Sequence, residues 1–126
     1  MEFYYHDVDR DILILSADGG LNAENAEQFV SELDRLIQVG AHKLVVDCRN
    51  LVYISSYGVG VLTRLHNKLS DRGGDIKLAS VRHKLVELLK LAKLNTIFHI
   101  YSTVDEARAA FRSGGADAQD RRSGLR

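Results

Sequence analysis

The sequence carries no net charge. Its 126 residues include 17 lysines and arginines against 17 aspartates and glutamates, so the formal net charge at pH 7 is zero. A dedicated nucleic-acid-binding protein normally has a basic surplus that displaces counterions from phosphates, and a protein that binds anionic membranes needs one as well. The balance therefore argues against nucleic acid and against a membrane surface as partners.

Long apolar runs and cysteine pairs are also missing. The longest apolar stretches, Ile12–Leu15 and Leu44–Val46, have the length of a β-strand, whereas a membrane span needs about 18 residues. The first residues show no basic segment followed by an apolar one, so we expect no secretory signal and a cytoplasmic location. The single cysteine, Cys48, cannot form an internal disulfide. Its place at the end of an apolar strand predicts a small buried side chain rather than a catalytic thiol.

Residue patterns typical of catalytic and metal sites are absent from the sequence. No two of the histidines have the four-residue spacing of a helical metal site, and the cysteine is not at ligand spacing from any of them. The sequence contains no nucleophile elbow, phosphate-binding loop or dinucleotide fingerprint. We therefore expect no metal, no cofactor and no enzymatic activity.

Apolar periodicity predicts one α/β domain over residues 1–112. Strands over 3–8 and 12–17 form a hairpin, and Asp18-Gly19-Gly20 ends the second of them. Helices and strands then alternate, which gives the order ββαβαβαβα and a mixed sheet whose later strands are parallel, with about four helices. Residues 113–126 lack apolar periodicity and are predicted to be a flexible tail.

The segment from Asp47 to Leu62 joins a predicted buried strand to a predicted helix. Ser55 and Ser56 stand at the helix N-terminus, where unpaired amides and the positive end of the helix dipole would stabilise an anion. Gly58 and Gly60 would let a partner or a neighbouring element approach the first turn. The alternative is structural: a serine caps the helix, and the glycines pack against the sheet.

The same segment resembles the signature of STAS domains, the family of bacterial anti-sigma factor antagonists. In that signature an aspartate ends a strand, and a hydrophobic-aromatic-Ile/Met-Asp-Ser-Ser/Thr-Gly-Leu-Gly sequence opens a helix. The matching residues are Asp47, Val52, Tyr53, Ile54, Ser56, Gly58, Val59 and Gly60. Residues 19–22 resemble the family's Gly-x-Leu-Asp, and residues 88–100 resemble its late helix-to-strand stretch. The resemblance therefore covers roughly residues 3–112.

The resemblance implies a regulatory protein that binds an anti-sigma factor, which is a serine-protein kinase of the ATPase fold, and so frees a sigma factor. Phosphorylation within the family's serine pair ends that binding. Ser56 aligns with the first hydroxyl of the pair and is the first candidate acceptor, and Ser55 is the second. The expected partner-binding residues are Asn22, Ser55, Ser56, Tyr57, Gly58 and Gly60.

The chain departs from the family pattern at the site itself. Ser55 replaces the family's aspartate, Tyr57 replaces the second Ser/Thr, and Asn22 stands where aspartate is common. These departures keep a second hypothesis open: an unphosphorylated STAS scaffold, or a module that senses a nucleotide or lipid, with Tyr57 filling the site or stacking on the ligand. The sequence leaves the oligomeric state open.

Overall fold

The computed structural model describes residues 2–9, 12–38 and 40–112. The elements in chain order are β1 (Glu2–Asp9), β2 (Ile12–Leu21), α1 (Ala23–Gln38), β3 (Lys43–Asp47), β4 (Leu51–Ile54), α2 (Ser56–Ser70), β5 (Asp75–Ala79), α3 (His83–Leu91), β6 (His99–Tyr101) and α4 (Val104–Arg112), with a 3-10 turn over Leu94–Thr96. The segment 113–126 lies outside the described residues, so the flexible tail stays a prediction.

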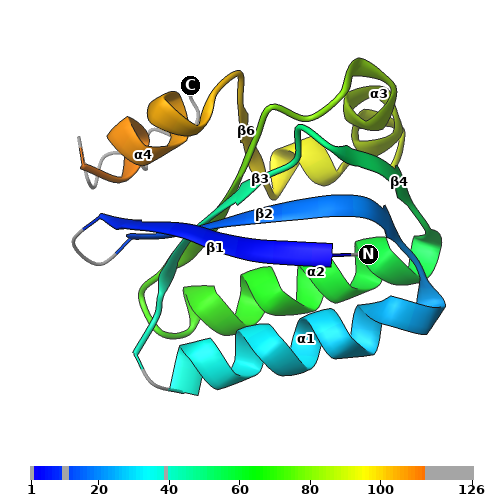
Figure 1. Ribbon diagram of the computed structural model, residues 1–126. Helices are drawn as coiled ribbons and strands as arrows, with labels where there is room; N and C mark the ends of the chain where they lie inside the picture. The colour runs from blue at the N-terminus through cyan, green and yellow to red at the C-terminus, as the bar shows by residue number, and fades with distance from the viewer. Residues whose placement is uncertain (1, 10–11, 39, 113–126) are drawn as a thin grey trace.

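The sheet confirms the predicted α/β architecture. Its strand order is β1-β2-β3-β5-β6, and β4 pairs with the end of β2. β1 runs antiparallel to β2, whereas every other described pair is parallel. The N-terminal hairpin is therefore followed by parallel strands, which are joined through helices except for the short turn between β3 and β4, as Figure 1 shows.

The prediction that Asp18-Gly19-Gly20 ends the second strand is wrong. β2 continues to Leu21 because the added strand β4 pairs with its last residues. Gly20 pairs with Tyr53, and a Cβ atom on Gly20 would lie 3.2 Å from Cδ2 of that tyrosine. The long-range pairing overrides the local turn preference of the glycines, and the missing side chain leaves room for the ring.

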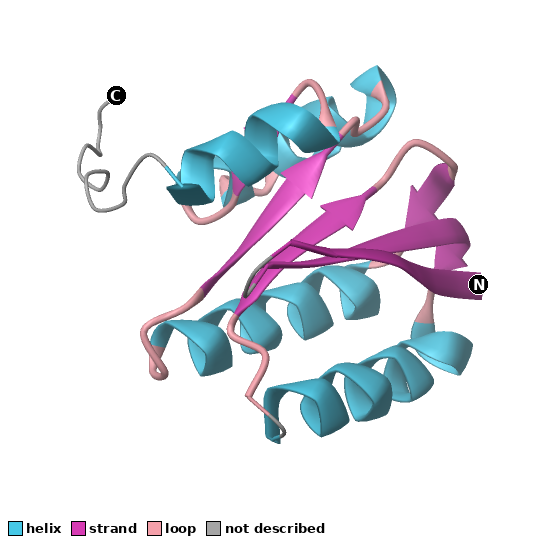
Figure 2. Cartoon of the chain, turned by 60° about the vertical axis from the view of Figure 1, so that its left-hand side comes forward, coloured by secondary structure: helices cyan, strands magenta, loops and turns pink. Residues whose placement is uncertain are grey.

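The sheet separates two layers of helices, with α1 and α2 on one face and α4 on the other (Figures 1 and 2). Successive strand residues point to opposite faces, so each central strand supplies both layers. In β3, for example, Leu44 and Val46 join the larger core with α1 and α2, whereas Val45 joins the smaller core beneath α4. Leu85 and Leu89 of α3 extend the larger core.

The parallel strands place several functional segments at one edge of the sheet. The carboxyl ends of β2, β4 and β5 lead into α1, α2 and α3 respectively, and ligand sites of open α/β sheets commonly lie at this edge. Over the described ranges, no helix is long and apolar enough to span a membrane.

Candidate functional site

Ser55 is the N-cap residue of α2. Its backbone is extended, with φ −82° and ψ 169°, and its Oγ accepts a hydrogen bond from the N–H of Gly58 at 3.0 Å. Its own N–H donates to the carbonyl of Leu21 at 2.8 Å. The structural alternative raised by the sequence is thus confirmed for Ser55, which ties the start of α2 to the end of β2 and satisfies a first-turn amide.

Ser56 is the first residue of α2, and its side chain is exposed. Among the residues that the structure describes, its hydroxyl has no hydrogen-bond partner. The hydroxyl therefore stands free at the positive end of a helix of 15 residues. The two adjacent serines differ in kind, because one is used by the fold and the other is available.

The two glycines of the site also differ. Gly58 is buried, and a Cβ atom there would lie 2.9 Å from both Cγ and the carbonyl oxygen of Leu21. Its missing side chain therefore allows α2 to pack against the end of β2. Gly60 is exposed, and nothing lies within 4 Å of a Cβ placed there, so packing does not explain this second glycine.

Asn22 caps α1 beside the start of α2. Its Oδ1 accepts from the N–H groups of Glu24 at 2.9 Å and Asn25 at 3.2 Å, and its own N–H donates to Oδ1 of Asn25 at 2.9 Å. Because the preceding residue, Leu21, bonds Ser55, the caps of α1 and α2 are neighbours. The structure thus places Asn22 close to the start of the segment 55–60, and the partner-binding role of these residues stays a prediction.

Tyr57 connects the site to α1. Its side chain is 46% exposed, and its hydroxyl donates to the carboxylate of Glu27. This hydrogen bond is the main reason that the pKa of Tyr57 lies above its ordinary value of 10.0. Nη2 of Arg64 lies 3.8 Å from the same carboxylate. Glu27 and Arg64 were not among the residues predicted for the site, although the seven-residue spacing of Tyr57 and Arg64 places both on one face of α2.

Asp47 and Cys48 lie beneath the site rather than on its surface. The Asp47 carboxylate is 6% exposed and accepts from the backbone N–H and from Nη2 of Arg49, both at 3.1 Å, which holds the β3–β4 turn. Burial, reinforced by Asp47, raises the pKa of the Cys48 thiol to about 12. The thiol is therefore protonated at neutral pH, and its predicted burial is confirmed.

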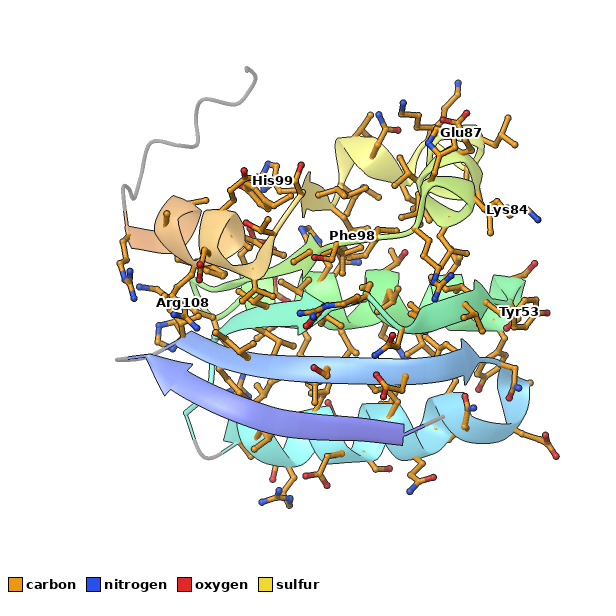
Figure 3. All side chains as sticks on the ribbon, turned by 45° about the horizontal axis from the view of Figure 1, so that its top comes forward. Tyr53, Lys84, Glu87, Phe98, His99 and Arg108 are labelled. Atoms are coloured by element: carbon orange, nitrogen blue, oxygen red, sulfur yellow. The ribbon has the colours of Figure 1, made fainter. Side chains whose placement is uncertain are left out.

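Large apolar side chains surround the start of α2 on the surface. Val52 and Tyr53 of β4 are 57% and 52% exposed, comparable to Tyr57. Figure 3 shows Tyr53 at the same end of the sheet as the N-terminus of α2. Neighbouring exposed apolar residues on an otherwise well-packed domain are typical of an interaction surface. Within the described ranges, no group of three acidic, histidine or cysteine residues could hold a metal ion.

Comparisons with known proteins agree with this picture. The model of the STAS domain family matches residues 6–107. The chain is 32% identical over 111 residues to a candidate anti-sigma factor antagonist of Thermotoga maritima, and the alignment covers 87% of this chain and 97% of that protein. A crystal structure of a protein of the same description and organism superposes with a TM-score of 0.81, at 32% identity, over 87% of this chain and 94% of the other.

A more distant structure shares the fold alone. The Bacillus cell fate determinant SpoIIAA in its phosphorylated form is 20% identical, with a TM-score of 0.68 over 86% of this chain and 97% of the other. The family model and the relative from Thermotoga maritima each cover most of the chain, including the whole of the α2 site segment 55–60. The chain therefore belongs to the STAS domain family.

Proposed function

We propose that this protein is an anti-sigma factor antagonist that binds its anti-sigma factor through the α2 site, defined as Asn22 and residues 55–60. The observation that carries the proposal is the contrast at the start of α2, where Ser55 is consumed as a cap and Ser56 presents a free, exposed hydroxyl. The description of the relative from Thermotoga maritima supports the same role. Binding, not catalysis, is the function that this surface favours.

The proposed switch is phosphorylation of Ser56. A phosphoryl group adds a charge of about −1.5 to −2 at neutral pH. The dipole of α2 tolerates this charge in the free protein, so the fold has no reason to change. In a packed interface the same charge loses its hydration or meets an acidic group, and the complex is weakened. Ser55 is the poorer acceptor because phosphorylation would remove the cap bond to Gly58.

The proposed partner is an anti-sigma factor that is itself a serine-protein kinase of the ATPase fold. Since the chain has no net charge, it offers no strong long-range field that would steer such a partner. Recognition would then depend on the shape and contacts of the α2 site. The charge of one phosphoryl group at Ser56 would exceed the net charge of the whole chain, which makes phosphorylation an effective signal.

The test combines a kinase assay with a binding assay. The wild-type chain, Ser56→Ala and Ser55→Ala are incubated with the anti-sigma factor kinase of the same genome, and the intact mass of each is measured. We expect wild type and Ser55→Ala to gain one phosphoryl group, and Ser56→Ala to gain none. Calorimetry should show binding of the unphosphorylated chain that weakens at least about tenfold on phosphorylation.

Two results would contradict these proposals separately. A modification that persists in Ser56→Ala excludes Ser56 as the main acceptor while leaving the binding function intact. Absence of binding in both phosphorylation states excludes the anti-sigma factor antagonist function itself. The Ser55→Ala variant serves as the matched control, because it removes a neighbouring hydroxyl of the same helix end.

A second function is favoured by the contact between Tyr57 and Glu27. This hydrogen bond holds an aromatic ring at the place of the family's second hydroxyl, which suits a module that does not switch or one that stacks a small ligand. Native mass spectrometry of the purified protein tests the ligand version: a co-purified nucleotide or lipid supports it, and the mass of the bare chain contradicts it.

A further inference from the structure

Helix α3 has a buried face and an unusual exposed face. Leu85 and Leu89 are buried in the larger core, whereas Leu88 and Leu91 are 41% and 82% exposed. Lys84, Leu88 and Leu91 follow the spacing i, i+4, i+7 and therefore share one outward stripe. Two exposed leucines on a helix of nine residues are more than the isolated apolar residues that any surface carries.

The exposed face of α3 is also basic, although the chain as a whole is neutral. Four exposed basic residues lie on α3 or next to it against one acidic residue, Glu87: Arg82, Lys84, Lys90 and Lys93. Glu87 pairs with Lys90 at 3.8 Å. Across the part of the chain that the structure describes, no carboxylate pairs with Lys84 or Lys93. Figure 3 shows Lys84 pointing outward from α3, away from the sheet.

This face continues into the α2 site through β4. Nε of Arg82 donates to the carbonyl of Arg49 at 3.3 Å, which ties the start of α3 to the turn that precedes β4. β4 contacts α3, carries the exposed Val52 and Tyr53, and ends directly before Ser55. An apolar and basic surface therefore begins at the start of α2 and extends over β4 onto α3.

We propose that Val52, Tyr53, Leu88 and Leu91, together with Lys84 and Lys93, form a second docking surface that binds an acidic amphipathic helix of the protein partner. We call it the α3–β4 surface; the identity of that partner rests on the proposed function. A helix that alternates carboxylates with an apolar stripe matches both the leucines and the unpaired ammonium groups. The neutral chain and the acidic Glu87 within the face disfavour a lipid bilayer, which needs a larger basic excess.

The first test uses the anti-sigma factor kinase as probe and three variants of the full chain. Lys84→Glu and Leu91→Ser change the proposed surface, and Arg72→Glu is the matched control, because it makes the same charge reversal at an exposed residue beyond the C-terminal end of α2. All three side chains are exposed, so an unchanged unfolding midpoint should confirm that the fold is intact. We expect Lys84→Glu and Leu91→Ser to weaken binding about tenfold and Arg72→Glu less than about twofold. Equal binding by all three variants overturns the proposal.

The second test separates this surface from the proposed function. A synthetic helical peptide with glutamates and leucines at i, i+4 spacing, a scrambled peptide of equal composition, and phosphatidylserine vesicles are each titrated into the labelled chain and followed by NMR. We expect only the helical peptide to shift the amide signals of α3 and β4, and Leu91→Ser to abolish the shifts. If the kinase fails to bind while the peptide binds here, the proposed function fails and the surface stands. Shifts elsewhere, no shifts, or binding of the vesicles alone overturn the proposal.

Discussion

The polar groups at the two edges of the parallel sheet differ in whether they have partners within the domain. At the amino end of β5, the Asp75 carboxylate lies 3.0 Å from Nζ of Lys77, 3.5 Å from Nδ1 of His99 and 3.7 Å from Nε2 of His66. At the carboxyl edge, within the described residues, the hydroxyl of Ser56 and the ammonium groups of Lys84 and Lys93 find no such partner.

The difference separates groups that stabilise the fold from groups that we propose to bind a partner. The Asp75 cluster is satisfied internally, and the Lys77 ammonium also lies 4.5 Å from the ring centroid of Phe111, so this edge holds β5 and α4 together. The α2 site and the α3–β4 surface leave polar and apolar groups unmatched, and a partner can match them. The proposed sites are therefore distinguished by unpaired polar groups and not by a cluster of charges alone.

The largest expected effect on stability comes from removing the carboxylate of the Asp75 cluster. Asp75→Asn removes the carboxylate that pairs Lys77, whose side chain is only 9% exposed. We expect the free energy of unfolding in urea at pH 7 to fall by roughly 2–4 kcal/mol, because an uncompensated charge is left in a mostly buried place. Adding Lys77→Met should restore a large part of the loss. A change below about 0.5 kcal/mol would show that the cluster does not stabilise the fold.

The same variant should change the acid limb of the stability curve. Burial acts to raise the pKa of Asp75, but His99 and Lys77 outweigh it, so the pKa lies below its ordinary value of 3.8. A lowered carboxyl pKa contributes stability above the ordinary value, and this contribution is lost as pH falls toward the lowered one. Urea unfolding between pH 5 and pH 2 (about the range over which carboxyls titrate) should therefore be less steep with pH for Asp75→Asn than for wild type.

A smaller effect is expected from the two glycines of the α2 site. Gly58→Ala forces a Cβ against Leu21, including its backbone oxygen, and we expect a loss of roughly 1–3 kcal/mol from overpacking, partly offset by helix propensity. Gly60→Ala meets open space and should stabilise by about 0.5–1 kcal/mol. A lower free energy of unfolding for Gly58→Ala and a higher one for Gly60→Ala, measured by chemical unfolding, would confirm that the two glycines differ in packing. Destabilisation by both variants would mean that α2 packs differently from the structure.

Alanine variants of the two adjacent serines should differ in unfolding free energy by about the contribution of one helix cap. Ser55→Ala removes the acceptor of the Gly58 N–H and should cost about 1 kcal/mol in unfolding free energy. Ser56→Ala should stay within about 0.5 kcal/mol of wild type, because its side chain is exposed. Ser55→Ala should therefore be the less stable variant and still accept a phosphoryl group, whereas Ser56→Ala should be the more stable variant and accept none. Equal losses in stability would contradict the different roles of the two hydroxyls.

The smallest effect concerns the contact between α1 and α2. The hydrogen bond to Glu27 raises the pKa of Tyr57, and Glu27→Gln should return this pKa toward 10.0 without a measurable change in the unfolding midpoint. NMR titration of the ring carbons of specifically labelled tyrosine resolves the signal, and Tyr57→Phe assigns it. An unchanged titration in Glu27→Gln would show that the carboxylate does not hold the hydroxyl.

Much of the local structure at the carboxyl edge of the sheet can be predicted from neighbouring residues in the sequence. Apolar periodicity predicts the strands and helices around it, and the hydroxyl and amide side chains of Ser55 and Asn22 predict helix starts, because capping acts over three residues of the same segment. The burial of Cys48 follows from its place beside an apolar strand. These features depend on neighbours in sequence, which are visible without a structure.

Tertiary structure decided what depends on distant neighbours. The extension of β2 through Gly19 and Gly20 required β4, and the wrong prediction there arose because turn preference is local whereas strand pairing is not. The contact between Tyr57 and Glu27 joins residues 30 positions apart, and the unlike roles of Gly58 and Gly60 depend on which one faces Leu21. The sequence by itself determined the alternation of strands and helices, although β4 was not among the predicted strands. Which side chains are satisfied and which remain for a partner was decided by packing, because only the folded chain brings distant groups within contact.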